Sequence, residues 1–134
     1  MSTVVHKEQI ATLLIESCPS FKAEYEALDD EDKELPYIVA GDFSRHLLNL
    51  YKGNNLIEFP NVVQFIELLH MNGDAYVREY ATIGILEAVQ NIWGHSDVDP
   101  NIFADCLLPQ SRQAWNDLDK FWQTGAIIPD RQKK

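Results

Sequence analysis

The fold is decided by DAYVREYATIGILEAVQNIWG, residues 74–94, which carry the most apolar helical pattern of the chain. Its apolar positions recur every three or four residues and form one wide face, made of Val77, Tyr80, Ala81, Gly84, Ile85, Ala88, Val89 and Ile92. Asp74 is a good N-cap, and Gly94 ends the pattern. We therefore predict a helix over residues 75–93 at the centre of a bundle. Gly84 inside this helix indicates a close approach of a neighbouring helix, since glycine costs about 1 kcal/mol there relative to alanine.

Helical periodicity continues on both sides of this segment. Further helices are predicted over residues 5–17, 20–28, 36–52, 59–71, 99–108 and 109–124. The best candidate for a strand is the short segment 125–129. The expected fold class is therefore all-α, a single irregular bundle of about six to seven helices joined by short connections.

Residues 74–81 also resemble the second helix of a HEAT repeat. The shared features are an N-cap at Asp74, an apolar Val77 facing the core and Arg78 reaching a neighbouring helix end. A HEAT array repeats every 40–47 residues or so and needs about three units, whereas one good unit is present here. HEAT-like helical hairpins are therefore the alternative arrangement, and the irregular bundle is favoured.

A length of 134 residues indicates one helical domain over residues 1–134, with loose ends at Met1–Val5 and in a flexible tail, 129–134. The two cysteines, Cys18 and Cys106, are too few for a disulfide framework and lack a CxxC neighbour, so we expect buried free thiols. Free thiols suit a reducing cytosol. No signal peptide and no membrane-spanning apolar run are visible, and we expect a cytoplasmic protein.

The net charge is the feature of the sequence that most clearly indicates the class of partner. The chain has 21 Asp+Glu against 11 Lys+Arg, for a formal net charge of -10. Phosphate backbones and anionic membrane surfaces repel such a chain, so we expect neither direct nucleic-acid nor membrane binding. A basic protein would instead be attracted over a Debye length of about 8 Å at physiological salt.

Candidate chemistry is sparse, and we expect no enzymatic activity, no metal and no cofactor. None of His6, His46, His70 and His95 belongs to an HExxH motif, and we assign them packing or surface roles. Glu67-x-x-His70 has the spacing of a di-iron bundle site, but a second copy is missing. Glu67 and Glu87 interrupt apolar helix faces, where a structural salt bridge is favoured. A small enzyme using Glu87 or His70 is a distant third hypothesis.

Two acidic groups are the candidate partner-binding sites. The first is a charged connector that contains Asp29, Asp30, Glu31, Asp32 and Glu34, for which a solvated loop is the competing interpretation. The second joins Asp97 and Asp99 to the nearby Trp93. An aromatic side chain beside acids is a plausible hot spot, because burial of the ring supplies energy and charge guides association. On the last helix, Trp115 and Trp122 share a face, and at least one of them is expected in the core.

Five segments together carry a family resemblance: Leu35–Tyr37, Gly41–Arg45, Gly73–Asp74, Gly84–Glu87 and Ser111–Trp115. They are similar to small bacterial helical proteins of uncharacterised-domain type, which look like the immunity proteins of contact-dependent growth-inhibition and polymorphic toxin systems. The resemblance covers about residues 17–122 and rests on packing motifs, so it assigns no interface residue.

The resemblance and the charge together predict an immunity protein. It would bind a cognate basic nuclease toxin domain, expected to be an RNase, and cover its active site or substrate-binding surface, since an acidic protein mimics phosphate charge. We expect a monomer on its own. The alternative function is an acidic helical adaptor or regulatory protein with no toxin partner.

Overall fold

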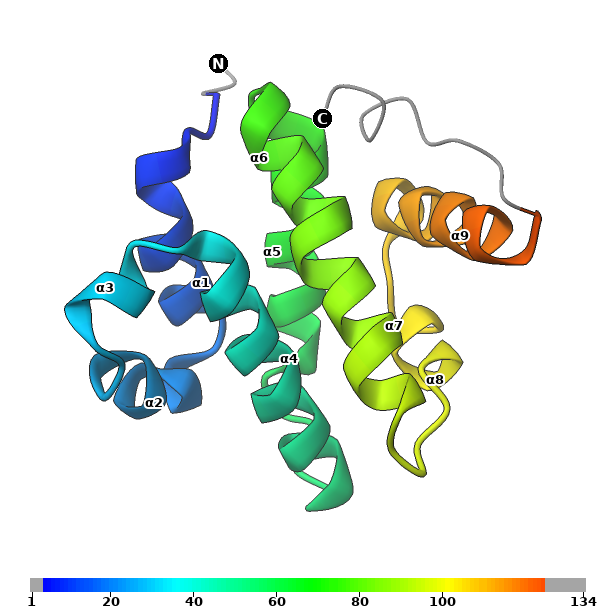
Figure 1. Cartoon of the computed structure of the whole chain (residues 1–134), viewed down its shortest axis with the longest axis horizontal. Helices are drawn as coiled ribbons and strands as arrows, with labels where there is room; N and C mark the ends of the chain where they lie inside the picture. Colours follow the sequence, from blue (N-terminus) through cyan, green and yellow to red (C-terminus); the bar gives the residue numbers. More distant parts are fainter. Residues whose placement is uncertain (1–3, 125–134) are drawn as a thin grey trace.

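The computed structural model describes residues 4–124, which form an all-α bundle (Figure 1). Its elements are η1 (Lys7–Gln9), α1 (Ile10–Ser17), η2 (Pro19–Phe21), α2 (Lys22–Glu26), α3 (Asp30–Lys33), α4 (Pro36–Lys52), α5 (Phe59–Asn72), α6 (Ala75–Glu79), η3 (Tyr80–Leu86), α7 (Glu87–Gly94), α8 (Asn101–Ala104) and α9 (Pro109–Thr124). The labels η1 and η2 denote 3-10 helices, and η3 is a π-helical segment. The predicted all-α bundle is confirmed. The predicted strand 125–129 and tail 129–134 lie outside the described residues.

The predicted central helix is present as α6, η3 and α7, which follow one another without a break. It runs diagonally across Figure 1 with α4 on one side and α9 on the other, and α5 also packs against it. Val77, Tyr80, Ile85 and Val89 are fully buried, as the pattern predicts. The turn widens in the middle, where the Glu87 N–H donates to the carbonyl five residues earlier, an i→i−5 bond typical of π-helix.

Helix ends follow the local signals of the sequence. Pro36 and Pro109 each occupy the first position of a helix, where a missing N–H costs little. The Asp74 side chain caps α6 by accepting a 2.9 Å hydrogen bond from the Val77 N–H. This cap and the buried Val77 are two of the features shared with a HEAT helix, whereas Arg78 is exposed.

The chain near its first described residue is fixed, although Met1–Val5 was expected to be loose. The Val5 N–H donates to the Asn72 carbonyl at 2.8 Å, and the Asp74 N–H donates to the Val5 carbonyl at 3.0 Å. Val5 is also buried. The prediction is therefore wrong for Val5, because two backbone hydrogen bonds attach it to the α5–α6 connection. Within residues 4–124, no helix is both long and apolar enough to cross a membrane.

An aromatic cluster fills the core between α7, α8 and α9. The Phe103 ring lies 5.5 Å from the Trp93 ring and 6.5 Å from the Trp115 ring, centroid to centroid. All three side chains are fully buried. The prediction that at least one tryptophan of the last helix lies in the core is therefore confirmed by Trp115. Trp122, on the same helix, is 51% exposed.

Gly84 lies where a side chain would meet Tyr80, four residues earlier in the same helix, and Tyr37 of the neighbouring α4. A Cβ atom there would lie 2.9 Å from Tyr80 Cδ1 and 3.4 Å from Tyr37 Cε1. Tyr80 is buried and packs edge-on against the Tyr37 ring, 5.6 Å away, so its ring has little room to move. We predict that Gly84→Ala lowers the free energy of unfolding by about 1 kcal/mol, despite the better helix propensity of alanine. Urea unfolding measures this change, and a stabilised variant would contradict the tight packing.

Candidate functional site

The first predicted acidic group lies on a short helix and not in a solvated loop. Asp29 has extended backbone angles and precedes α3, and three acids occupy its first turn. Negative charge at a helix N-terminus is favourable, which explains a helix in so charged a segment. Asp29, Asp30, Glu31 and Glu34 are exposed, and Asp32 is half-buried. Four of the five carboxylates are therefore accessible to solvent, and their binding of a partner stays a prediction.

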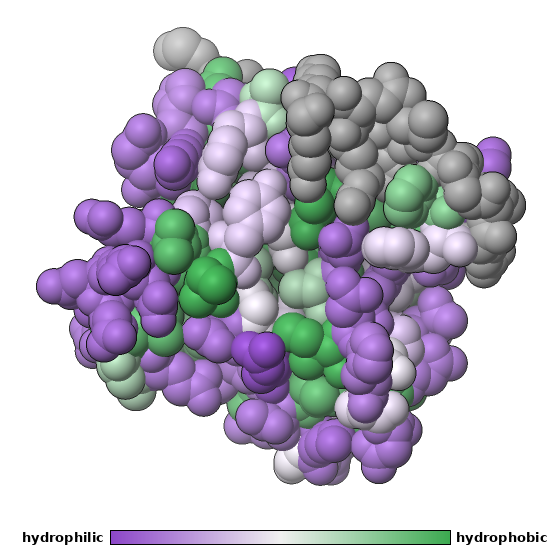
Figure 2. All heavy atoms as spheres, in the orientation of Figure 1, coloured by the Kyte–Doolittle hydropathy of each residue, from purple (hydrophilic) through white to green (hydrophobic). Residues whose placement is uncertain are grey.

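Apolar side chains lie directly beside these acids. Leu35, Tyr37 and Ile38, at the start of α4, are 46%, 42% and 47% exposed. Figure 2 shows hydrophobic side chains among hydrophilic ones over the region where α3 leads into α4. We call the acids of residues 29–34 and these three apolar side chains the α3–α4 face. It combines exposed carboxylates with accessible apolar area.

A groove with a volume of about 530 Å³ adjoins this face. It is lined by residues of η1, α1, α2, α3, α4 and η3, including Tyr25, Lys33, Glu34 and Tyr80. The buried Tyr80 hydroxyl has no hydrogen-bond partner among the described residues. The Lys33 ammonium lies over the Tyr25 ring, 5.7 Å from its centroid, so the one lysine of the acidic run contacts its own chain.

The second predicted group does not form one surface, and the prediction that Trp93 belongs to a binding surface is wrong. Trp93 is fully buried, and its indole N–H donates to the Ser44 carbonyl at 3.2 Å. Trp93 therefore cannot contact a partner from the surface, because the apolar face of α7 turns it into the core.

The acids of the second group are exposed, but each has a local role. Lys52 Nζ lies 3.2 Å from Asp97 and holds the pKa of that carboxyl below its usual value. The Asp99 carboxylate accepts the Asn101 N–H at 2.9 Å, at the start of α8. Figure 1 places this α7–α8 connection on the opposite side of the molecule from α3, so the fold does not join the two acidic groups.

Glu67 and His70 belong to a structural network that links α5 to α9. The Glu67 carboxylate accepts the Ser111 N–H at 2.9 Å, the Ser111 hydroxyl at 2.9 Å and the Gln110 N–H at 3.0 Å. It therefore caps the N-terminus of α9, where its negative charge is favourable. Burial alone would raise the pKa of Glu67, but these hydrogen bonds and nearby His70 outweigh burial and lower it.

His70 is held as the neutral imidazole. Its Nδ1 lies 3.1 Å from the Ile66 carbonyl, which can only accept, so Nδ1 carries the proton. Its Nε2 then accepts from the Thr82 hydroxyl, 2.9 Å away. Burial lowers the pKa of His70 from its ordinary value of 6.5. Glu67 and His70 therefore take part in hydrogen bonds that connect α5 to α9 and η3.

His70 makes stability depend on pH. Because its pKa is lower in the folded protein, the unfolded chain binds the proton first, and the stability present above about pH 6.5 is lost below it. Glu67 acts in the same direction below pH 4.5, its ordinary pKa, because its pKa is also lower in the folded protein. We predict lower stability at pH 5 than at pH 7 in urea unfolding, and a smaller difference for His70→Asn. An equal difference in both proteins would contradict the assignment.

A third cluster was not predicted, because its members are far apart in the sequence. The Cys18 thiol donates to Glu58 Oε1 at 3.3 Å, and the Ser20 N–H donates to Glu58 Oε2 at 3.1 Å. Ser20 Oγ lies 2.7 Å from His46 Nε2 and also donates to Glu58. His46 Nδ1 lies 2.8 Å from the Glu24 carboxylate. The expectation of buried free thiols holds for Cys18 but is wrong for Cys106, which is exposed at the end of α8.

The fold and its exposed acids define an acidic all-α protein. Residues 11–123 match the family model described as a domain of unknown function, DUF7674, and the chain belongs to this family. No curated protein and no solved structure matches the chain.

Proposed function

We propose that the protein binds a basic protein partner through the α3–α4 face, and that this partner is a nuclease toxin domain which it neutralises in the cytoplasm. The observation that carries this proposal is the run of exposed acids beside exposed apolar side chains, in a chain of net charge -10. Nucleases that grip RNA or DNA present basic clefts to the phosphate backbone, so an acidic surface is complementary to them.

The α3–α4 face supplies the two contributions that a protein interface needs. Asp29, Asp30, Glu31 and Glu34 attract a basic surface before contact, which raises the association rate. Leu35, Tyr37 and Ile38 offer apolar area, and its burial slows dissociation. In this proposal the protein acts as a monomer. The nucleic-acid-binding cleft of the partner lies against the α3–α4 face.

The groove beside the face suits an inserted side chain of the partner. Its lining includes Glu34, which attracts a lysine or arginine of the partner. The buried Tyr80 hydroxyl, unpaired among the described residues, gains a hydrogen bond if a polar group of the partner enters. The Asp97 and Asp99 group is left out of this interface, because Figure 1 places it on the other side.

The second candidate function is an acidic helical adaptor with no toxin partner. The exposed apolar residues Leu35, Tyr37 and Ile38 favour binding of some protein, and they do not by themselves require a nuclease. The partner's charge and activity separate the two functions.

Affinity capture from a lysate of the source organism tests the proposal, with identification by mass spectrometry. We expect the full-length protein to retain one basic polypeptide that carries nuclease activity and is released as salt is raised. A bait with lysines in place of Asp29, Asp30, Glu31 and Glu34 should retain much less of it. Retention of the same acidic or neutral proteins by both baits would favour the adaptor and contradict the immunity function.

A further inference from the structure

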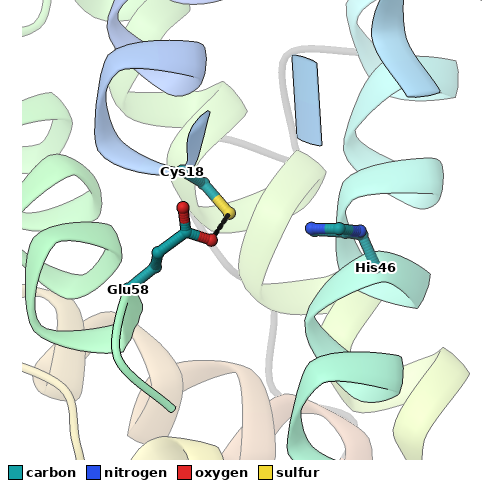
Figure 3. Close-up of side chains that lie close together, drawn as sticks. All are labelled: Cys18, His46 and Glu58. Carbon is teal, nitrogen blue, oxygen red and sulfur yellow. Dashed lines mark hydrogen bonds between the residues drawn. The ribbon is translucent and has the colours of Figure 1, made fainter. Parts of the chain in front are cut away.

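Three side chains that commonly bind metal ions meet at one place, although they come from separate elements. Cys18 lies between α1 and η2, His46 lies in α4, and Glu58 immediately precedes α5. Their ligand atoms all lie within 4.8 Å of one another. Figure 3 shows the Cys18 sulfur beside the Glu58 carboxylate, with the His46 ring directed toward both.

We propose that Cys18, His46 and Glu58 bind one Zn²⁺ ion. Thiolate sulfur, imidazole nitrogen and carboxylate oxygen are the ligands that zinc takes in proteins. A tetrahedral site with ordinary Zn–S and Zn–O bonds separates sulfur from oxygen by about 3.6 Å. Cys18 Sγ and Glu58 Oε1 are 3.3 Å apart, so this edge of the site is nearly in place.

Glu24 orients the histidine for this role. Its carboxylate lies 2.8 Å from His46 Nδ1, so Nδ1 carries a proton, and Nε2 is the ring nitrogen that faces the cluster, where it contacts Ser20 Oγ. A carboxylate that accepts from the free nitrogen of a ligating histidine is the usual outer partner in zinc sites. His46 itself is buried, which limits its rotation. Glu24 is therefore a positioning residue.

Ser20 occupies the space between the ligands. Its Oγ lies 2.7 Å from His46 Nε2 and 3.7 Å from Cys18 Sγ, and it also donates to Glu58. Because Ser20 is exposed, rotation about its χ1 bond can clear this space for the ion. Water then fills the fourth coordination position.

Zinc must displace the proton of the Cys18 thiol. Burial, together with the Glu58 charge, raises the pKa of this thiol to about 12, so the sulfur is protonated until a metal binds. The proton passes to the solvent, and the zinc charge compensates both the thiolate and the Glu58 carboxylate. The bound ion joins the α1–α2 segment to α4 and α5.

Titration of the metal-free full-length chain with Co²⁺ and then Zn²⁺ tests this site. We expect one equivalent of Co²⁺ to bind with a thiolate-to-cobalt charge-transfer band, and Zn²⁺ to abolish the band by displacement. Cys18→Ser should remove the band, whereas Cys106→Ser, the matched control at the other free thiol, should leave it unchanged. His46→Gln and Glu58→Gln should each weaken binding at least about tenfold.

Circular dichroism distinguishes a lost site from a lost fold. Each variant should keep the wild-type helical spectrum, and Zn²⁺ should raise the melting temperature of the wild type but not of Cys18→Ser. Glu24→Gln should weaken Zn²⁺ binding about tenfold while keeping the charge-transfer band at saturation. The proposal is overturned if the wild type shows no charge-transfer band, or if the band survives in Cys18→Ser and disappears in Cys106→Ser.

Discussion

Trp93→Ala is expected to lower the free energy of unfolding by about 4 kcal/mol, the largest stability effect of the substitutions considered. The substitution removes a fully buried indole that packs 5.5 Å from the Phe103 ring and 5.7 Å from the Tyr51 ring. It also removes the donor to the Ser44 carbonyl. The surrounding aromatic rings can collapse only partly into the space, so a cavity remains. Urea unfolding of the wild type and the variant measures the difference.

Trp122→Ala is the matched control, because it removes the same side chain from a position that is 51% exposed. We expect a loss of about 1 kcal/mol or less. Together the two variants test whether Trp93 contributes to stability and not to a contact surface. Equal stabilities of Trp93→Ala and the wild type would show that the indole is not in the core.

Reversing the charge of the α3–α4 face is expected to slow association with the basic partner by at least about tenfold at low salt. The α3 variant carries Asp29→Lys, Asp30→Lys, Glu31→Lys and Glu34→Lys. These four side chains are exposed, so their replacement leaves the core intact. Because steering is electrostatic, the difference between wild type and variant should shrink as salt is raised. Stopped-flow mixing with the captured partner measures both association rates.

The control for this experiment changes the net charge equally at another place. The α7–α9 variant carries Asp97→Lys, Asp99→Lys, Asp105→Lys and Asp117→Lys. All four are exposed, in or beside α8 and α9. We expect a much smaller change in association rate, because local charge at the interface dominates steering. If both variants slow association equally, overall charge guides the partner and the α3–α4 face has no special role.

The helices could be predicted from sequence because their signals are local. Pro36 and Pro109 begin helices, Asp74 caps one, and the spacing of apolar residues around Val77 and Ile85 identified the central helix. The sequence predicts a charged connector where helix α3 forms, because a short acidic run has no apolar periodicity. Its helical form depends on the favourable interaction of acids with a helix N-terminus.

The arrangement of side chains across helices could not be predicted in the same way. Trp93 is next to exposed acids in the sequence, but helical geometry turns its ring inward while Asp97 and Asp99 remain in the following connection. Cys18 and Glu58 are 40 positions apart and meet only because α1 packs against α5. The spacing of residues within one segment of sequence cannot predict a contact between two distant segments.

The Cys18, His46 and Glu58 side chains and the α3–α4 face are connected through α2. Glu24 of α2 contacts His46 of α4, and α2 leads directly into the acidic helix α3. An ion bound by His46 would strengthen this attachment and hold the acids in place relative to α4. The two proposals still fail separately, since metal binding is measured without the partner and partner binding is measured without added metal.

The central claim is that the protein neutralises a basic nuclease domain, and a titration of nuclease activity tests it most directly. Increasing amounts of the protein are added to a fixed amount of the captured nuclease domain cleaving RNA. We expect cleavage to fall in proportion to added protein and to end near one equivalent, whereas the α3 variant should need a large excess. Undiminished cleavage at a large excess of the wild-type protein would contradict it.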